Sequence, residues 1–383
     1  MTITVVSDVL GEENNGTTIA AMNLIRFLRS RGHRVRILCA DQYRKADEDT
    51  FVVPNLDLGR LLNGYVERVG VTLAKVDEDI VREAIVGSDH VHIMLPFMLG
   101  VKACEVAWEM GISTTAGFHM QAENFTSHLK LNKLEPLNNA VYRYIYDSFY
   151  QFVDAIHYPT DFIRNLFESK IGRKTAGYVI SNGVNGYVER REVRRPPEYE
   201  GKIIILSTGR FSREKSQDTL IRAIGYSKHR DRIQLILGGK GPKEDYYKRL
   251  GRSLPLPPVL NFFSREEIID VLNYSDIYVH PAEVELEGIS CLEAISCGKL
   301  TIVSDSKRAA TSGFAVDEKC IFKNRDPKSL AAVIDYFIDN PEAKRECEEK
   351  YLASKVAYNQ EDCMLRMEEM IKEVYRGKKS NIL

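Results

Sequence analysis

Apolar strand-like segments alternate with amphipathic helix-like segments along this chain, and the alternation limits the possible folds more than any other feature. Residues 35–39 are typical of a buried strand and follow a helical pattern that ends at Gly32. Residues 90–94 and 113–118 predict two further strands around a helix over residues 100–110. Such alternation predicts a parallel sheet with helices on both faces.

The alternation starts again after residues 190–198, a charged segment with prolines and no periodic apolar residues, which predicts a linker. A chain of 383 residues also exceeds what one hydrophobic core usually supports. We therefore predict an α/β protein with two doubly wound, Rossmann-like domains that face a central cleft. The second set of predicted strands covers residues 203–207, 233–237, 277–280 and 300–304, with helices near residues 219–226, 264–273 and 289–297.

Composition excludes some classes of protein and partner. The 53 basic and 54 acidic side chains nearly cancel, which gives no indication of a nucleic-acid partner. Seven scattered cysteines, none in a C-x-x-C pair, predict buried thiols in a reducing compartment. No signal region opens the sequence and no run approaches 18 apolar residues, so we expect a cytosolic protein. A peripheral position on the inner face of the membrane stays open.

Residues 128–152 combine aromatic with basic side chains. This composition fits contact with a membrane surface. Aromatic stripes are more often part of a core, so the preferred interpretation is an amphipathic helix that packs on its own domain.

A loop over residues 207–216 is predicted between a strand and a helix. Gly209 lets the backbone come close to a ligand, and Arg210 and Lys215 add two cations. An arginine fork and a lysine ammonium at the carboxyl edge of a sheet suit a diphosphate without a metal ion. Ser216 is the expected N-cap of the next helix. A solvated charged turn is the structural alternative.

A second glycine-rich turn, residues 238–242, follows the next predicted strand. Its glycines, Gly241 among them, would let the backbone approach a ligand, and Lys240 would add positive charge near a phosphate. A plain tight turn would use the same residues.

Two carboxylates flank a predicted helix start in residues 285–294. If the helix begins near Gly288, the free amides of Ile289 and Ser290 form an anion site. Glu285 would then project from the loop, where a carboxylate can accept bonds from sugar hydroxyls. Glu293, one turn further on, can bind ribose hydroxyls.

In this order along nearly the whole chain, these motifs resemble the retaining glycosyltransferases of the GT-B fold, family 4. The resemblance implies that Arg210 and Lys215 bind the donor diphosphate, Glu285 lies near the transferred sugar and Glu293 binds the donor ribose. The donor-binding set that it implies is Gly16, Thr17, Gly209, Arg210, Lys215, Gly241, Glu285, Gly288, Ile289, Ser290 and Glu293, with His119, Arg210, Lys215 and Glu285 as catalytic residues.

The resemblance also implies a domain division. An acceptor-binding domain over residues 1–185 would be completed by a C-terminal helix over residues 358–378, and a linker over residues 186–200 would lead to a donor-binding domain over residues 201–357. Met364, Met367 and Met370 occur at helical spacing in that terminal segment.

In the first domain the match is less regular. His119 resembles a histidine that closes a strand beside the donor sugar, and Gly16 and Thr17 resemble the first glycine-rich loop. Asn14 and Asn15 stand where the family often has paired glycines. Residues 120–124 are similar to a branch that acts on lipid or polysaccharide precursors.

The resemblance implies transfer of a hexose with retention, from a nucleoside-diphosphate donor that family frequency favours as UDP-linked. A lipid hydroxyl is the favoured acceptor, such as a diacylglycerol-type or other glycolipid precursor, with a soluble or polysaccharide acceptor as the alternative. No Asp-x-Asp metal dyad is suitably placed, so we expect neither a metal nor another cofactor. Double displacement would need a carboxylate nucleophile, and none is evident. The implied route is attack on the face that the diphosphate leaves.

Three rival functions differ in what they would release or bind. A nucleotide-sugar epimerase of GT-B architecture would need no acceptor. A non-catalytic nucleotide-sugar-binding subunit would tolerate loss of Arg210, Lys215, Glu285 and Glu293, which are all present. A dehydrogenase is disfavoured because no G-x-G-x-x-G with a downstream acid opens either domain.

Overall fold

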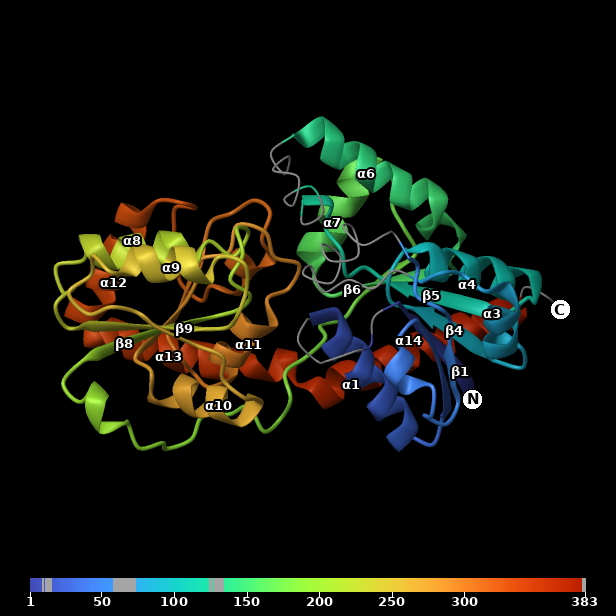
Figure 1. The fold of residues 1–383 in the computed structure, drawn as a ribbon, viewed down its shortest axis with the longest axis horizontal. Helices are drawn as coiled ribbons and strands as arrows, with labels where there is room; N and C mark the ends of the chain where they lie inside the picture. Colours follow the sequence, from blue (N-terminus) through green and yellow to red (C-terminus); the bar gives the residue numbers. More distant parts are fainter. Residues whose placement is uncertain (9, 11–15, 58–73, 124–125, 127–133, 381–383) are drawn as a thin grey trace. The chain divides into compact units, whose positions relative to one another are not determined.

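A computed structural model of the chain describes residues 1–8, 10, 16–57, 74–123, 126 and 134–380. The chain divides into two compact units. Unit 1 comprises Met1–Asn182 with Glu361–Leu383, and unit 2 comprises Gly183–Gln360. Each unit contains a parallel sheet with helices, as the alternation predicted (Figure 1).

Unit 1 is built on a sheet whose described strands are all parallel. Its strands are β1 (Thr2–Ser7), β2 (Arg34–Cys39), β3 (Thr50–Val52), β4 (His90–Ile93), β5 (Ser113–Gly117), β6 (Ala155–Tyr158) and β7 (Gly177–Val179). Its helices are α1 (Gly16–Ser30), α3 (Glu78–Ile85), α4 (Met98–Glu109), α6 (Glu135–Ser148), α7 (Asp161–Ile171) and α14 (Gln360–Ser380). The strand order is β3-β2-β1-β4-β5-β6-β7.

The C-terminal helix α14 belongs to the core of unit 1. Met364, Met367 and Ile371 are buried in one cluster with Ile3 and Val5 of β1. Figure 1 shows this red helix beside the blue strand β1. The methionine spacing therefore predicted a real helix, and its apolar stripe is the face buried on the sheet.

Unit 2 is also built on a parallel sheet. Its strands are β8 (Ile203–Thr208), β9 (Ile233–Gly238), β10 (Val259–Asn261), β11 (Ile277–His280), β12 (Thr301–Ser304) and β13 (Ile321–Phe322). Its helices are α8 (Gln217–Tyr226), α9 (Glu244–Gly251), α10 (Arg265–Tyr274), α11 (Ile289–Ser296), α12 (Pro327–Asp339) and α13 (Pro341–Ser354). The strand order is β10-β9-β8-β11-β12-β13. Helices α8, α9 and α12 cover one face of the sheet, and α10, α11 and α13 cover the other (Figure 1).

The segment predicted as a linker, residues 186–200, lies within unit 2. The Arg191 amide donates to Asn273 Oδ1 at 2.9 Å. The Arg195 guanidinium donates to Asp276 Oδ1 at 2.8 Å and to the Tyr274 carbonyl at 2.9 Å. These polar contacts, together with the buried Val188 and the Tyr199 ring, which lies 6.1 Å from that of Tyr274, hold the segment to unit 2 without an amphipathic helix or strand.

The aromatic segment near α6 packs on its own unit, as the preferred interpretation held. Tyr142, Phe149 and Tyr150 are buried, and the Tyr150 ring lies 5.2 Å from that of Phe118 between centroids. Tyr144 is exposed. Membrane contact by this segment stays a prediction.

Two expectations from composition have counterparts in the fold. All seven cysteines are buried and unpaired, as predicted. Within the part of the chain that the structure describes, no helix has the length and apolar character needed to cross a bilayer.

Candidate functional site

The strand order of unit 2 reverses between β8 and β11, which are neighbours in the sheet. Ile205 of β8 pairs with Ile277 of β11. From this point the chain proceeds to β9 and β10 on one side and to β12 and β13 on the other. In open α/β sheets, ligands bind outside the carboxyl ends of the strands at such a switch point. The loops that follow β8 and β11 are the ones that the sequence singled out.

The loops after β8 and β9 are joined backbone to backbone. The Gly209 amide donates to the Gly238 carbonyl and the Phe211 amide to the Lys240 carbonyl, both at 2.9 Å. A Cβ atom at Gly241 would lie 2.5 Å from the Phe211 carbonyl oxygen, which no side chain can tolerate. The glycine in this turn therefore has a packing reason, and a ligand is not needed to explain it.

Lys215, Glu285 and His280 form one charged cluster at the switch point. The Lys215 ammonium is ion-paired with Glu285 Oε2. His280, the last residue of β11, places Nε2 3.0 Å from the same oxygen. The His280 side chain is only 2% exposed, while Lys215 and Glu285 retain 22% and 14% exposure. The structure thus brings two predicted residues together, with a histidine behind them that the prediction did not include.

Glu285 stays ionised in this cluster. Burial would raise the pKa of its carboxyl, but the Lys215 charge and the His280 hydrogen bond outweigh burial and lower that pKa to about 2. An ionised carboxylate only accepts hydrogen bonds. Glu285 is therefore suited to binding hydroxyl groups and not to donating a proton.

Helix α11 begins where the sequence predicted, after Gly288. The backbone of Gly288 has φ 87°, and a Cβ atom there would lie 2.7 Å from Thr311 Cγ2. A side chain would also crowd Cγ of Glu285, 3.2 Å away. The amides of Ile289 and Ser290 lie in the first turn of this helix, where an anion site stays a prediction.

The other predicted residues of unit 2 lie around these loops. Arg210 is exposed, and its carbonyl accepts a bond of 3.0 Å from Gln217 Nε2. Glu293 is half-buried on α11, where burial, opposed by Arg265, raises its pKa to about 7. Ser216 occupies the N-cap of α8, but its side chain makes no capping bond. Its left-handed backbone, φ 52°, differs from the extended conformation typical of a capping residue, so the predicted N-cap position is confirmed but the capping hydrogen bond is absent.

A second buried carboxylate, Glu283, also escaped the sequence analysis. It is only 1% exposed and is ion-paired with Arg308 and Arg325. Its amide donates to the Glu214 carbonyl at 2.7 Å, which ties the loop after β11 to the loop after β8. The Glu285 amide donates to the Arg308 carbonyl at 3.1 Å. Nothing in the local sequence indicated these ion pairs, because Glu283, Arg308 and Arg325 are far apart along the chain.

The predicted site residues of unit 1 lie in a different environment. His119 folds back over Gly117, where a Cβ atom would lie 2.4 Å from His119 Nε2. That nitrogen is buried with no hydrogen-bond partner among the described residues, and the ring lies 5.6 Å from the His157 ring. Burial, aided by His157, lowers the pKa of His119 to about 3. Gly16 and Thr17 open α1, and Asn14 and Asn15 lie outside the described residues.

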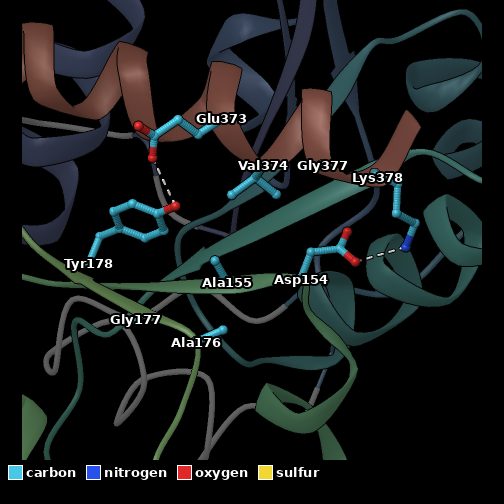
Figure 2. Close-up of a pocket in the computed structure, with 9 residues that line it drawn as sticks. All are labelled: Asp154, Ala155, Ala176, Gly177, Tyr178, Glu373, Val374, Gly377 and Lys378. Atoms are coloured by element: carbon cyan, nitrogen blue, oxygen red, sulfur yellow. Dashed lines mark hydrogen bonds and ion pairs between the residues drawn. The ribbon is translucent and has the colours of Figure 1, made fainter. Parts of the chain in front are cut away.

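A cavity of about 470 Å³ in unit 1 contains none of the predicted site residues (Figure 2). It lies at the amino ends of β6 and β7 beside α14, where Figure 2 shows two polar pairs. Lys378 bonds to Asp154 at 2.8 Å and Tyr178 to Glu373 at 3.0 Å. Both pairs hold α14 to the sheet, so the cavity wall has a structural role.

Two family descriptions cover most of the chain. "Glycosyltransferase Family 4" matches residues 14–186, and "Glycosyl transferases group 1" matches residues 188–351. The chain therefore belongs to the group 1/family 4 glycosyltransferases, in agreement with the resemblance found in its sequence. Its two units are the Rossmann-like domains of the GT-B fold.

The similar proteins include two curated relatives. A GDP-mannose-dependent alpha-(1-6)-phosphatidylinositol dimannoside mannosyltransferase of Mycobacterium tuberculosis is 24% identical over 196 residues, 50% of this chain and 51% of that protein. The phosphatidylinositol N-acetylglucosaminyltransferase GPI3 subunit of Saccharomyces cerevisiae is 33% identical over 108 residues, 27% of this chain and 24% of that protein. The chain spans about half the length of the first curated relatives it matches.

A solved structure matches over nearly the whole chain. HepE of Anabaena, in complex with UDP-glucose, superimposes with a TM-score of 0.75 at 15% identity and covers 97% of this chain and 100% of its own. At this identity the likeness establishes the shared fold.

Proposed function

We propose that this protein is a retaining hexosyltransferase that moves a hexose from a nucleoside-diphosphate sugar, UDP-linked by preference, to a hydroxyl acceptor. The cluster of Lys215, Glu285 and His280 at the switch point of unit 2 carries the proposal. It combines a partly exposed cation with an ionised carboxylate on the edge of the sheet where a glycosyltransferase of this fold binds its donor. Family membership supplies the reaction type.

Each charged group has a role in the proposed reaction. The leaving diphosphate gains negative charge as the glycosidic bond breaks, and Arg210 and Lys215 stabilise that charge. Lys215 and His280 both contact Oε2 of Glu285, which leaves Oε1 to accept a hydroxyl of the transferred sugar. Glu293 accepts the ribose hydroxyls. His119 orients the hexose from unit 1 or shields positive charge on it through its carbonyl.

Retention follows from attack on the face that the diphosphate leaves. A double displacement would need a carboxylate nucleophile on the opposite face. In the proposal Glu285 has a different role, in which its Oε1 accepts a sugar hydroxyl, and the sequence indicates no other carboxylate for the opposite face. In the proposed route the departing phosphate oxygen takes the proton of the acceptor hydroxyl.

A membrane lipid hydroxyl is the proposed acceptor class. The names of both curated relatives refer to phosphatidylinositol. The exposed Tyr144, within the aromatic and basic segment of residues 128–152, adds a side chain suited to a membrane–water interface. The proposed location is the cytosol, in peripheral contact with the inner face of the membrane. A soluble or polysaccharide acceptor is the alternative that the experiment below separates.

The test is a nucleotide-release assay over a panel of UDP- and GDP-linked hexoses, with lipid vesicles, soluble acceptors or neither. Glu285→Ala is the inactive control, and product analysis by mass spectrometry and NMR gives the acceptor and the anomeric configuration. Acceptor-dependent release that the variant abolishes, with a retained anomer, supports the proposal. Release without an acceptor indicates the epimerase, binding without release indicates the non-catalytic subunit, and an inverted product overturns the proposed mechanism. Activity that survives EDTA is expected, since no metal is part of this mechanism.

A further inference from the structure

His280 lies in a chain of buried polar groups that ends at Glu285. Nε2 of His280 is 3.0 Å from Glu285 Oε2, and Nδ1 is 3.3 Å from the Tyr278 hydroxyl. The Tyr278 hydroxyl lies 2.9 Å from Thr208 Oγ1, at the end of β8. Both His280 and Tyr278 are fully enclosed. This series of hydrogen bonds therefore crosses the switch point, from Thr208 at the end of β8 to the carboxylate of Glu285.

The chemistry of the partners decides where the protons are. Glu285 is ionised and can only accept, so His280 Nε2 must carry the hydrogen that it donates to Oε2. Burial lowers the pKa of His280, and the opposing effect of Glu285 is smaller. The imidazole is therefore neutral at neutral pH. Nδ1 is then an acceptor for the Tyr278 hydroxyl. Tyr278 in turn accepts from the Thr208 hydroxyl, so each hydroxyl and ring N–H in the chain has an acceptor.

The geometry of Glu285 gives this chain a consequence for the donor sugar. Lys215 is 22% exposed and can shift with the diphosphate that it is proposed to bind, whereas His280 is fixed in β11. A fixed donor on Oε2 limits the rotation of the carboxylate and leaves the same oxygen, Oε1, available to a ligand. The absence of a side chain at Gly288 leaves room for Glu285, since a Cβ atom there would lie only 3.2 Å from its Cγ.

We propose that His280 is a positioning residue for the donor sugar: its neutral Nε2–H holds Glu285 so that Oε1 meets a sugar hydroxyl. This inference rests on the proposed function. It assigns His280 no contact with the diphosphate. Loss of the imidazole therefore weakens binding of the sugar part of the donor and leaves binding of the nucleoside diphosphate unchanged, a difference that general damage to the fold would not produce.

The test compares His280→Leu, which has no donor, with His280→Gln, whose amide N–H can replace Nε2–H. Each protein is titrated calorimetrically with UDP-glucose and UDP and with GDP-mannose and GDP, and the pair that binds the wild type is used. His280→Leu should bind the nucleotide sugar about tenfold more weakly, with less than about a twofold change for the diphosphate. His280→Gln should recover most of the loss. His229→Leu, which removes a partly buried histidine of unit 2 whose Nε2 lies 2.9 Å from Asp339 Oδ1, is the matched control.

Two results would overturn the inference, and they differ from failure of the proposed function. Equal binding of the nucleotide sugar by wild type and His280→Leu removes the positioning role. An equal loss for nucleotide sugar and diphosphate that His280→Gln does not recover shows a merely structural role. Binding of neither pair by the wild type overturns the proposed function itself, and the inference with it.

Discussion

Polar side chains at the carboxyl ends of the strands are ionised and paired in unit 2 but buried and neutral in unit 1. In unit 2, Lys215 and Glu285 are bound to each other and keep their charges. In unit 1, Asp8, just after β1, has both carboxyl oxygens buried, and no cation among the described residues is paired with them. Burial raises the pKa of Asp8 to about 7, and the pKa of His119 falls to about 3. Burial thus favours neutral groups at one edge, while pairing preserves charges at the other.

This difference indicates a division of labour. Under the proposed function, the partly exposed Lys215 is available to the leaving diphosphate, while His280 keeps Glu285 hydrogen-bonded. Neutral groups at the edge of unit 1 suit neutral hydroxyls. Under the proposed function, the cations of unit 2 stabilise charge on the leaving diphosphate, while hydroxyl groups are bound by carboxylates of unit 2 and by neutral groups of unit 1. The following experiments test this contrast.

The largest expected effect comes from removing the cation of unit 2. Lys215→Met should lower the rate of transfer about 10²–10³-fold, because it removes charge stabilisation from the leaving diphosphate. Steady-state nucleotide release measures this loss. Lys228→Met, an exposed lysine of unit 2, is the control. A variant that retains more than about a tenth of wild-type activity would break the assignment of charge stabilisation to unit 2.

The second expected effect, from Asp8, is on the free energy of unfolding and not on the rate of transfer. Since the folded-state pKa is raised above the ordinary value of 3.8, the folded protein holds a proton that the unfolded chain has lost between about pH 4 and pH 7. The free energy of unfolding should therefore fall as pH rises through this window and level off above it. Asp8→Asn cannot ionise and should remove the contribution of Asp8 to this dependence, a gain of about 4 kcal/mol at pH 8 relative to wild type, since one pKa unit corresponds to about 1.4 kcal/mol.

Denaturant unfolding at pH 5 and pH 8 checks the Asp8 prediction. Asp147→Asn, at an exposed position of α6, is the matched control and should leave the pH dependence in place. If the free energy of unfolding of Asp8→Asn changed between the two pH values as much as that of the wild type, Asp8 would not be a neutral carboxyl in the folded protein. The contrast between the two units would then rest on His119 alone.

Glu293 tests whether a carboxylate with a raised pKa binds the donor ribose in its ionised form. With a pKa of about 7, the ionised fraction rises about tenfold between pH 6 and pH 8. Donor affinity should increase by up to that factor over the same range, and Glu293→Gln should flatten the profile. Calorimetric titration at both pH values measures the effect, with the exposed Glu266→Gln as control. A wild-type profile that is flat would remove Glu293 from the ribose site.

The smallest effect is expected from the histidine of unit 1. His119→Gln should lower transfer about fivefold, the value of one neutral hydrogen bond. The ratio of the wild-type rate to the His119→Gln rate should also stay constant from pH 6 to pH 8, since His119 is neutral throughout this range. Transfer kinetics across pH check both statements. A loss as large as that of Lys215→Met would show that unit 1 also carries the chemistry.

Much of the fold follows from patterns that are local in the sequence. Apolar patterns predicted the central strands β2, β4, β5, β8, β9, β11 and β12 and helix α14, because burial of one face requires that spacing. The strands β3, β6, β7, β10 and β13 were not predicted. Gly288 marked the start of α11 because only glycine fits its backbone and the space beside Glu285. Family resemblance related Lys215 to Glu285 although 70 residues separate them.

The pairing of the groups around these motifs could not be predicted from the sequence, because it depends on how the strands assemble. In the sequence, His280 is an ordinary strand residue and Glu283 an ordinary loop carboxylate. In the structure, His280 lies beside Glu285, and Glu283 lies beside Arg308 and Arg325. Asp8 and His119 likewise give no local indication of how deeply they are buried. A local pattern records which face of an element is apolar. Hydrogen-bond partners and desolvation depend on residues that are distant in sequence and meet only when the strands assemble.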